Sequence, residues 1–394
     1  MKFVILFILV ISCNLKGAFG ELLIIQSSDN HSKYKRIEKF LVSSHEIISE
    51  FKKKYPKGEV IFVFNGDYSG ASSFANHRQD RGQLGLEVMA TLAQKYKVLF
   101  TFGNHEAFDW LAEGDANELL HKQLKYLHQN GVINLVSNIT TRNRTQNYIT
   151  GHFDYISRVG KKIRFQGLQL ESFFEKVATF NGHGPDEVLE VDSYLESAKK
   201  LIGRAKRDEV DSLVFAYHEG FTKVVKATED ILEYIPRKMK MPVAFAAHDH
   251  LVKDTFIEKT FVIDSGSNFY FSAVVLSDKG KLISHKFFDK KAQIDLAAKG
   301  KGLPKYLRST VKKLTSHINE LLDLSSEGLK TIPEISENKL TLKKQRSNVL
   351  GNSLGDSLRE FGLSKIQDKE LPPVKEVIGM FNSSSYRNDS NLDE

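Results

Sequence analysis

The chain has 394 residues, of which 41% are hydrophobic and 27% are charged. This is ordinary globular composition, long enough for a large core and two domains, and no stretch beyond residue 20 is apolar enough to span a membrane. The formal net charge of +7 comes from lysines spread along the chain, which is typical of a solvated surface. We therefore expect no nucleic acid among the partners, and a mild positive bias that attracts anionic substrates at most.

The first twenty residues have the features of a secretory signal peptide. A short basic start precedes the apolar run from Phe3 to Ile11, and the small residues of the segment from Ala18 to Gly20 suit a signal peptidase. Cys13 is the only cysteine, so cleavage there leaves no thiol in the mature chain. In the alternative interpretation, the segment from Val10 to Cys13 is a lipobox and Cys13 carries a lipid anchor. Both interpretations predict an exported protein that is secreted, periplasmic or held at the cell surface.

Apolar runs of strand length alternate with helical patterns between residues 21 and 137. The expected strands are 21–26, 60–64, 98–102 and 133–137, and the expected helices are 34–55, 85–96 and 117–129. This alternation is typical of a layered α/β domain.

Strand-like and helical patterns continue between residues 162 and 276. Further strands are expected at 162–170, 213–216, 239–246, 256–264 and 269–276, with a helix at 191–207. The last two of these strands have the alternation of antiparallel strands.

The chain therefore divides into four expected segments. They are a signal peptide over residues 1–20, a catalytic domain over 21–293, a linker helix within 294–330, and a partial C-terminal domain over 331–394. The linker helix is expected to begin at Pro304, and its apolar residues recur at helical spacing.

Five of the apolar runs end in residues that can bind metal ions. These ends are Asp29-x-His31, Gly66-Asp67, Gly103-Asn104-His105-Glu106, His218 and His248-x-His250. In a mostly parallel sheet, functional sites collect outside the carboxyl ends of the strands. Any one of these motifs alone is more often a turn or a polar surface loop, but the five together predict one dinuclear metal site.

Each residue type has a suitable role in such a site. The Asp67 carboxylate can bridge two cations, the Asn104 amide oxygen binds a metal without adding charge, and the histidines supply imidazole nitrogens. Two cations that share a carboxylate favour hydrolysis by a water molecule that attacks phosphorus. His105 is not needed as a ligand and can act as an acid above the leaving oxygen, oriented by Asp109 or Glu106. Mixed nitrogen and oxygen ligands suit Zn, Mn, Fe and Co alike.

These motifs, in this order, resemble those of the calcineurin-like metallophosphoesterases. The resemblance runs from Leu22 to Ser284 and includes Leu135-Val136-Ser137-Asn138 and the strand from Lys162 to Leu168. The chain is most similar to the exported 5′-nucleotidases, a branch that includes periplasmic UDP-sugar hydrolases and 2′,3′-cyclic phosphodiesterases. The resemblance implies a four-layer α/β/β/α sandwich.

The resemblance also implies an assignment of roles. One metal ion would be held by Asp29, His31, Asp67 and His250, and the other by Asp67, Asn104, His218 and His248. His105 would be the catalytic histidine. In the family's Gly-Asn-His-Glu-Phe-Asp motif the final aspartate is its partner. Here Ala107 is inserted, so Asp109 lies one position later.

The C-terminal segment resembles the beginning of the nucleoside-binding domain found in this family. The stretch from Leu350 to Arg359 is similar to the Leu-Gly-Asn-x-x-x-Asp start of that domain, and the stretch from Phe381 to Arg387 faintly resembles its phosphate-holding segment. The base-stacking half has no counterpart, so we expect this domain to be incomplete.

These features predict an exported two-metal phosphohydrolase that releases phosphate from nucleotides in the manner of a 5′-nucleotidase. The alternatives are a phosphodiesterase or sugar-nucleotide pyrophosphatase, and a non-catalytic ligand-binding protein on the same fold. The expected partner is a small phosphate ester, and we expect the chain to be a monomer.

Overall fold

The structure is a computed structural model that describes residues 20–31, 33, 36–68, 83–106, 116–141, 144–169, 189–300 and 302–316. Several sequence predictions fall outside these residues. They concern the signal peptide with Cys13, the Ala107 insertion with Asp109, the end of the linker helix, and the C-terminal segment.

The first of two six-stranded sheets is mixed. Its strands lie in the order β14 (Leu282–Phe288), β13 (Phe271–Leu276), β1 (Leu22–Ser27), β2 (Glu59–Asn65), β3 (Lys97–Thr101) and β4 (Val132–Asn134). The four strands from β1 to β4 are parallel, whereas β13 pairs antiparallel with β1.

The second sheet faces the first. Its order is β11 (Val252–Ile257), β12 (Thr260–Ser265), β10 (Lys240–Ala246), β9 (Ser212–Tyr217), β7 (Lys162–Leu168) and β6 (Phe153–Ile156). The strands β7, β9, β10 and β12 are parallel, and the two outer strands are antiparallel to their neighbours. A separate two-stranded ribbon pairs β5 (Ile139–Thr141) with β8 (Leu189–Val191).

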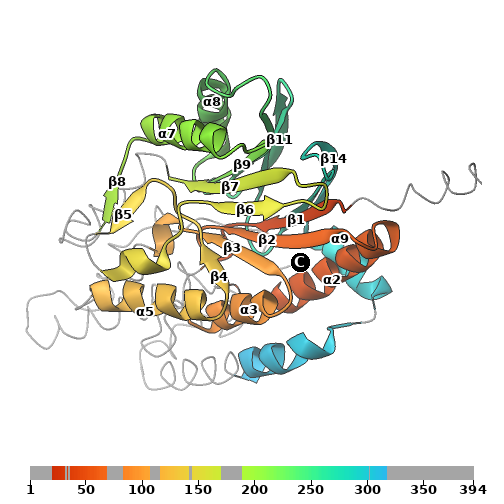
Figure 1. Cartoon of the computed structure of the whole chain (residues 1–394). Coiled ribbons are helices and arrows are strands. Elements are labelled where there is room, and N and C mark those ends of the chain that lie inside the picture. Colours follow the sequence, from red (N-terminus) through yellow and green to blue (C-terminus); the bar gives the residue numbers. More distant parts are fainter. Residues whose placement is uncertain are drawn as a thin grey trace, which may run out of the picture.

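Helices cover the outer face of each sheet (Figure 1). The first sheet carries α2 (Ile37–Lys54), α3 (Gln83–Ala93), α5 (Ala116–Gln129) and α9 (Lys290–Lys299), and the second carries α7 (Tyr194–Arg207) and α8 (Phe221–Leu232). A short 3-10 helix, η3 (Arg144–Tyr148), follows β5. The predicted four-layer α/β/β/α fold class is therefore confirmed.

The hydrophobic core is divided among the three interfaces between these layers. In β1, Leu22 and Ile24 face the second sheet, whereas Leu23 and Ile25 face the helices of the first. Side chains alternate between the two faces of a strand, so a strand buried on both faces reads as a continuous apolar run. This explains why the parallel strands were recognisable from sequence.

The predicted strand over 256–264 is wrong. Residues 258–259 form a turn between β11 and β12, with Glu258 at a φ of 53°. β11 lies at the edge of its sheet and is mostly exposed, so its sequence has no burial pattern that marks where it ends and the buried strand β12 begins. The sequence patterns also gave no signal for α8, α9 or β14.

The linker helix is present over residues 305–316. Its side chains Leu307, Val311 and Leu314 are buried in the core between the first sheet and its helices. Among the described residues, the structure has no helix with the length and apolar character that a membrane crossing requires.

Candidate metal centre

All seven predicted metal-binding residues follow strands whose carboxyl ends meet at one edge of the molecule. Asp29 and His31 follow β1, Asp67 follows β2, and Asn104 follows β3. The second sheet contributes His218 after β9, and His248 and His250 after β10. The structure thus brings together residues that are up to 221 positions apart in the sequence, from Asp29 to His250.

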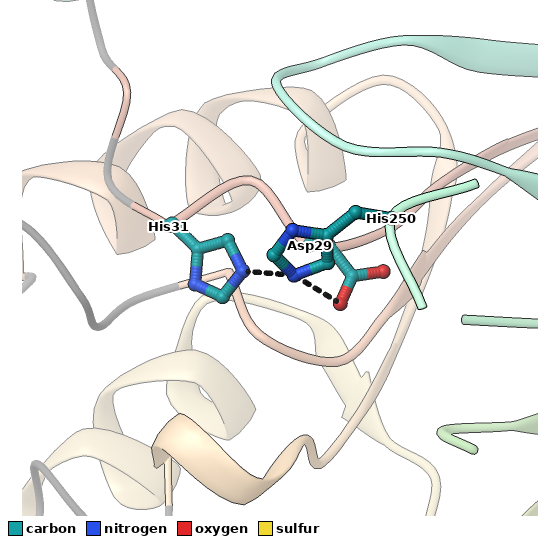
Figure 2. Close-up of side chains that lie close together, drawn as sticks. All are labelled: Asp29, His31 and His250. Carbon is teal, nitrogen blue, oxygen red and sulfur yellow. Dashed lines mark hydrogen bonds and ion pairs between the residues drawn. The ribbon is translucent and has the colours of Figure 1, made fainter. Parts of the chain in front are cut away.

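The first group in this centre consists of Asp29, His31 and His250 (Figure 2). Nε2 of His31 lies 2.9 Å from Nε2 of His250, and the latter nitrogen lies 3.6 Å from Oδ1 of Asp29. Two ring nitrogens at this separation share at most one proton, so at least one lone pair and a carboxylate oxygen point toward the same small volume, and loss of that proton frees the second lone pair. Such a convergence is suited to one cation.

A second group contains Asp67, His218 and His248. Nε2 of His218 lies 3.2 Å from Oδ2 of Asp67 and 3.3 Å from Oδ1 of Asn104. The rings of His218 and His248 are edge-on, with centroids 5.5 Å apart. The amide oxygen of Asn104 therefore joins this group, as the sequence predicted for a neutral ligand.

Asp67 connects the two groups, because one of its carboxylate oxygens also lies within 4.8 Å of a ring nitrogen of His31 and of a ring nitrogen of His105. The His105 ring stands edge-on to His31 at a centroid distance of 4.9 Å, and its backbone N–H donates to Oδ1 of Asp67 at 2.8 Å. The predicted acid is thus placed beside the ligand groups. Asp109, its predicted partner, lies outside the described residues.

The buried titratable groups of this centre have strongly shifted pKa values. Burial raises the pKa of Asp29 well above its usual value, despite the opposing effect of His218. Burial also acts to raise the pKa of Asp67, but His218 and His105 outweigh it and hold that pKa well below its usual value. Burial lowers the pKa of His218, and Asp67 reverses this and raises it to about 10. A buried carboxylate pair of this kind needs positive charge close by.

The residues present fit divalent cations. Asp29 and Asp67 are 0% and 1% exposed, and Nδ1 of His31 is buried and has no hydrogen-bond partner among the described residues. Carboxylate, amide and imidazole donors together are a typical set for borderline divalent metals. When no metal ion is bound, the proton on His218 supplies positive charge next to Asp67.

Backbone strain is concentrated in the same loops. Nine non-glycine residues among those described have a positive φ, and five of them are predicted ligands: Asp29, His31, Asp67, His248 and His250. Their φ values lie between 46° and 76°, in a region that most side chains avoid. Such strain persists only where surrounding contacts impose it, and it is typical of functional sites.

Glu106, which is 0% exposed, makes some of the contacts that hold this strained backbone in place. Its carboxylate accepts hydrogen bonds from the backbone N–H groups of Asp67 (2.8 Å), Tyr68 (2.7 Å) and Gly103 (2.7 Å). Sequence reasoning considered Glu106 only as an orienting partner for His105. The structure shows that it fastens the loop after β2 to the loop after β3, and so fixes Asp67.

Asn65 joins the two sheets beneath the centre. Its Nδ2 donates to the carbonyl oxygen of Tyr217 at 2.9 Å, and its Oδ1 accepts from Oγ1 of Thr101 at 2.9 Å. Its own carbonyl oxygen accepts from Nδ1 of His218. Asp29 makes a similar link, because both of its oxygens accept from the backbone N–H of His248 at 3.0 Å.

Asp249, between the two ligand histidines of the last motif, was missed by the sequence reasoning. Its Oδ2 accepts from the N–H of Phe221 at 2.9 Å, at the first turn of α8, which begins three residues after His218. Gly220 leaves room for this contact, since a Cβ there would lie 2.5 Å from Oδ1 of Asp249. Gly220 has no side chain that could cap α8, and because α8 itself was not predicted, the sequence held no signal for the role of Asp249.

Comparisons with known proteins give a family and several similar folds. The family model described as calcineurin-like phosphoesterase matches residues 22–252, which is more than half of the chain. No curated protein matches the sequence.

Similar solved structures include a 5′-nucleotidase precursor from Thermus thermophilus, with a TM-score of 0.54 and 16% identity over 75% of this chain and 59% of that one. The NAD nucleotidase of Haemophilus influenzae has a TM-score of 0.54 and 16% identity, over 77% and 68% of the two chains. A calcineurin-like phosphoesterase of Bacillus subtilis has a TM-score of 0.51 and 16% identity, over 77% and 98%. The chain thus spans less than two thirds of the Thermus protein, and at these identities the likeness concerns the fold.

Proposed function

The chain belongs to the calcineurin-like phosphoesterase family, and from this premise we propose that it is an exported two-metal phosphohydrolase that releases phosphate from nucleotides. The observation that carries the proposal is the position of the Asp67 carboxylate, which lies within reach of both ligand groups. Two metal ions that share this carboxylate would take their remaining ligands from the two groups, Asp29, His31 and His250 on one side and Asn104, His218 and His248 on the other.

The proposed chemistry divides between the cations and the chain. Two bound divalent cations supply Lewis acidity toward the phosphoryl oxygens and lower the pKa of a water molecule. The chain fixes the ligand positions through Glu106 and Asn65, so little reorganisation is needed during the reaction.

We propose that His105 acts as the general acid. Its backbone is held by Asp67 and its ring lies beside His31, so it borders the volume in which a phosphate ester would lie. From there the imidazole can donate a proton to the leaving oxygen as the ester bond breaks. We propose that Asp109 orients it, as the motif predicts.

Preference for nucleotides is supported by the sequence resemblance of residues 22–284 and of the C-terminal segment to exported 5′-nucleotidases. The likeness in fold to a 5′-nucleotidase and to a NAD nucleotidase agrees with it. The second of these also motivates the alternative substrates, a phosphodiester or the pyrophosphate bond of a sugar nucleotide.

A substrate panel tests the proposal. The metal-reconstituted chain is assayed with AMP, an aryl phosphate, a bis-aryl phosphate and a UDP-sugar, each with Mn²⁺, Co²⁺ or Zn²⁺. We expect phosphate release from AMP, abolished by Asp67→Asn and unaffected by Asp295→Asn, a matched change at an exposed position on α9. Faster turnover of the bis-aryl phosphate or UDP-sugar would replace the monoester assignment. Absence of turnover of every substrate would favour the non-catalytic alternative and contradict the proposal.

A further inference from the structure

Gln169 is the first residue after β7, at the edge of the second sheet that carries the metal centre. Leu168 pairs with Tyr217 in the parallel register of β7 and β9, so Gln169 lies beside His218 at the neighbouring strand end. Its side chain is 0% exposed. Any effect that Gln169 has on the centre therefore passes through the residues that it touches.

The side chain of Gln169 reaches across to the loop after β3. Its Nε2 donates a hydrogen bond to the carbonyl oxygen of Phe102, and because a carbonyl oxygen can only accept, this contact fixes the orientation of the amide. Phe102 and Gly103 are the two residues between the end of β3 and the helical turn that begins at Asn104. The bond thus joins the second sheet to the short connection that precedes Asn104 and His105.

The peptide unit between Phe102 and Gly103 is held from both sides. Its carbonyl oxygen accepts from Gln169, and its N–H donates to Oε2 of Glu106 at 2.7 Å. A peptide unit is planar, so these two bonds together determine its rotation. Gly103 also packs against Asp67, since a Cβ on Gly103 would overlap with Oδ1 of that carboxylate. Rotation of this peptide unit would therefore change the course of the ligand loop that follows it.

Gln169 is itself held in place by the buried amide of Asn138. Oδ1 of Asn138 accepts from the N–H of Gln169 at 2.9 Å, and Nδ2 donates to the carbonyl oxygen of Gln169 at 2.6 Å. Nδ2 also donates to the carbonyl oxygen of Asp192 at 3.2 Å, at the end of the β5–β8 ribbon. Asn138 closes a motif, residues 135–138, for which the sequence gave no role. It preorganises the backbone that carries the Gln169 side chain.

Stability alone does not explain an amide at position 169. Oε1 of Gln169 is buried and has no hydrogen-bond partner among the described residues. An unpaired buried acceptor costs folding free energy that an apolar side chain of the same size would not cost. An apolar side chain, however, would leave the carbonyl oxygen of Phe102 without this donor. The amide is therefore suited to holding the peptide unit before Asn104.

We propose that Gln169 is a positioning residue that directs Asn104 into the second ligand group, through the Phe102–Gly103 peptide unit. The inference rests on the proposed two-metal centre. Oδ1 of Asn104 lies 3.3 Å from Nε2 of His218, so an amide oxygen and a ring nitrogen already converge there. The first ligand group has no member on the loop after β3. The effect of Gln169 should therefore fall more heavily on the second metal position than on the first.

Calorimetric titration of the metal-stripped full chain with Mn²⁺ tests the inference. The variant Gln169→Met removes the donor and keeps the side-chain volume. We expect it to bind one ion as tightly as the unmodified chain does, and the other roughly 10- to 100-fold more weakly. Gln169→Asn, whose amide is one methylene too short to reach Phe102, should give the same result and provides the test if the Met variant does not fold.

Asn134 on β4 offers a matched control. It is also 0% exposed, and its Nδ2 donates to the carbonyl oxygens of Leu124 at 3.1 Å and Tyr148 at 2.9 Å, which lie outside the ligand loops. Its Oδ1, like Oε1 of Gln169, has no hydrogen-bond partner in the described part of the chain. Asn134→Leu should lower the melting temperature as Gln169→Met does, and leave both metal affinities unchanged.

The metal affinities decide the inference independently of turnover. Unchanged affinities in Gln169→Met, or an equal loss at both metal positions, would overturn it and leave the proposed function intact. Equal losses of affinity in Gln169→Met and Asn134→Leu would show a general effect of destabilisation and overturn it as well. If the unmodified chain binds two ions but hydrolyses no phosphate ester, the proposed function fails, and a selective loss in Gln169→Met still supports the positioning role.

Discussion

Nδ1 of His218 donates a hydrogen bond to the carbonyl oxygen of Asn65 at 2.9 Å, across the interface between the two sheets. A carbonyl oxygen can only accept, so Nδ1 carries the proton and the lone pair of the neutral ring is on Nε2. That nitrogen faces Asp67 and Asn104. The bond thus selects the tautomer that a metal ligand requires and sets the ring orientation.

Replacement of Glu106 should disturb the centre without removing a ligand. In Glu106→Gln the single amide oxygen cannot replace two carboxylate oxygens that accept from three backbone N–H groups, so a buried donor is left unpaired. We expect a loss of about 2 kcal/mol in the free energy of unfolding and metal binding weakened roughly 10- to 100-fold. Urea denaturation and titration calorimetry measure the two effects. The exposed Glu196→Gln serves as control, and unchanged metal affinity in Glu106→Gln would contradict the assigned role.

Asp249 is predicted to position the histidines on both sides of it through its hydrogen bond to Phe221. Asp249→Ala should weaken metal binding by roughly tenfold, whereas Asp249→Asn retains an acceptor oxygen and should restore most of the affinity. Calorimetric metal titration of both variants distinguishes positioning from a general loss of charge. Equal affinity of the Ala and Asn variants would argue against it.

The sequence pointed to the candidate ligands because each of them follows a buried strand that reads as an apolar run. The sequence could not identify the residues that hold these candidate ligands in position. Glu106 accepts from a backbone N–H 39 positions away, the Asn65 side chain donates to a carbonyl oxygen 152 positions away, and Asp249 accepts from an N–H 28 positions away. No local pattern encodes such contacts. The hairpin between β11 and β12 was missed for a related reason, since an exposed edge strand lacks the strong alternation of a half-buried one.

Substitution of His105 should lower the catalytic rate without loss of metal binding, whereas substitution of a metal ligand should lower both. If His105 donates a proton to the leaving group, His105→Asn should lower kcat roughly 100- to 10,000-fold and leave the number of bound metal ions unchanged. The effect should be smaller for an aryl phosphate with an acidic leaving group, which needs less protonation. A variant that loses metal together with activity would show that His105 is a ligand.

The buried carboxyl group of Asp264 should make the folding stability depend on pH. It is fully buried near the end of β12, and its Oδ1 accepts from the N–H of Gly266. Its Oδ2 has no hydrogen-bond partner in the part of the chain that the structure describes. Burial raises its pKa to about 7. The folded state therefore retains a proton that the unfolded chain loses near pH 4, so this contribution to stability is complete below that pH and is lost as pH rises toward 7.

Asp264→Asn should remove this dependence. In metal-free protein, the variant should gain about 2 kcal/mol of unfolding free energy over the unmodified chain between pH 5 and pH 8. Urea denaturation across this range measures it, with Asp254→Asn on the exposed strand β11 as control. A constant difference between the Asp264 variant and the unmodified chain at all pH values would contradict the prediction.

The stoichiometry of metal binding tests the central claim most directly. The metal-stripped chain is titrated with Mn²⁺ in a calorimeter, and the bound metal is then quantified by elemental analysis. We predict two ions per chain for the unmodified protein and for Asp295→Asn, and a loss of tight binding at both positions in Asp67→Asn, because one carboxylate serves both groups. A single bound ion, or two ions that survive the Asp67 substitution, would contradict the account.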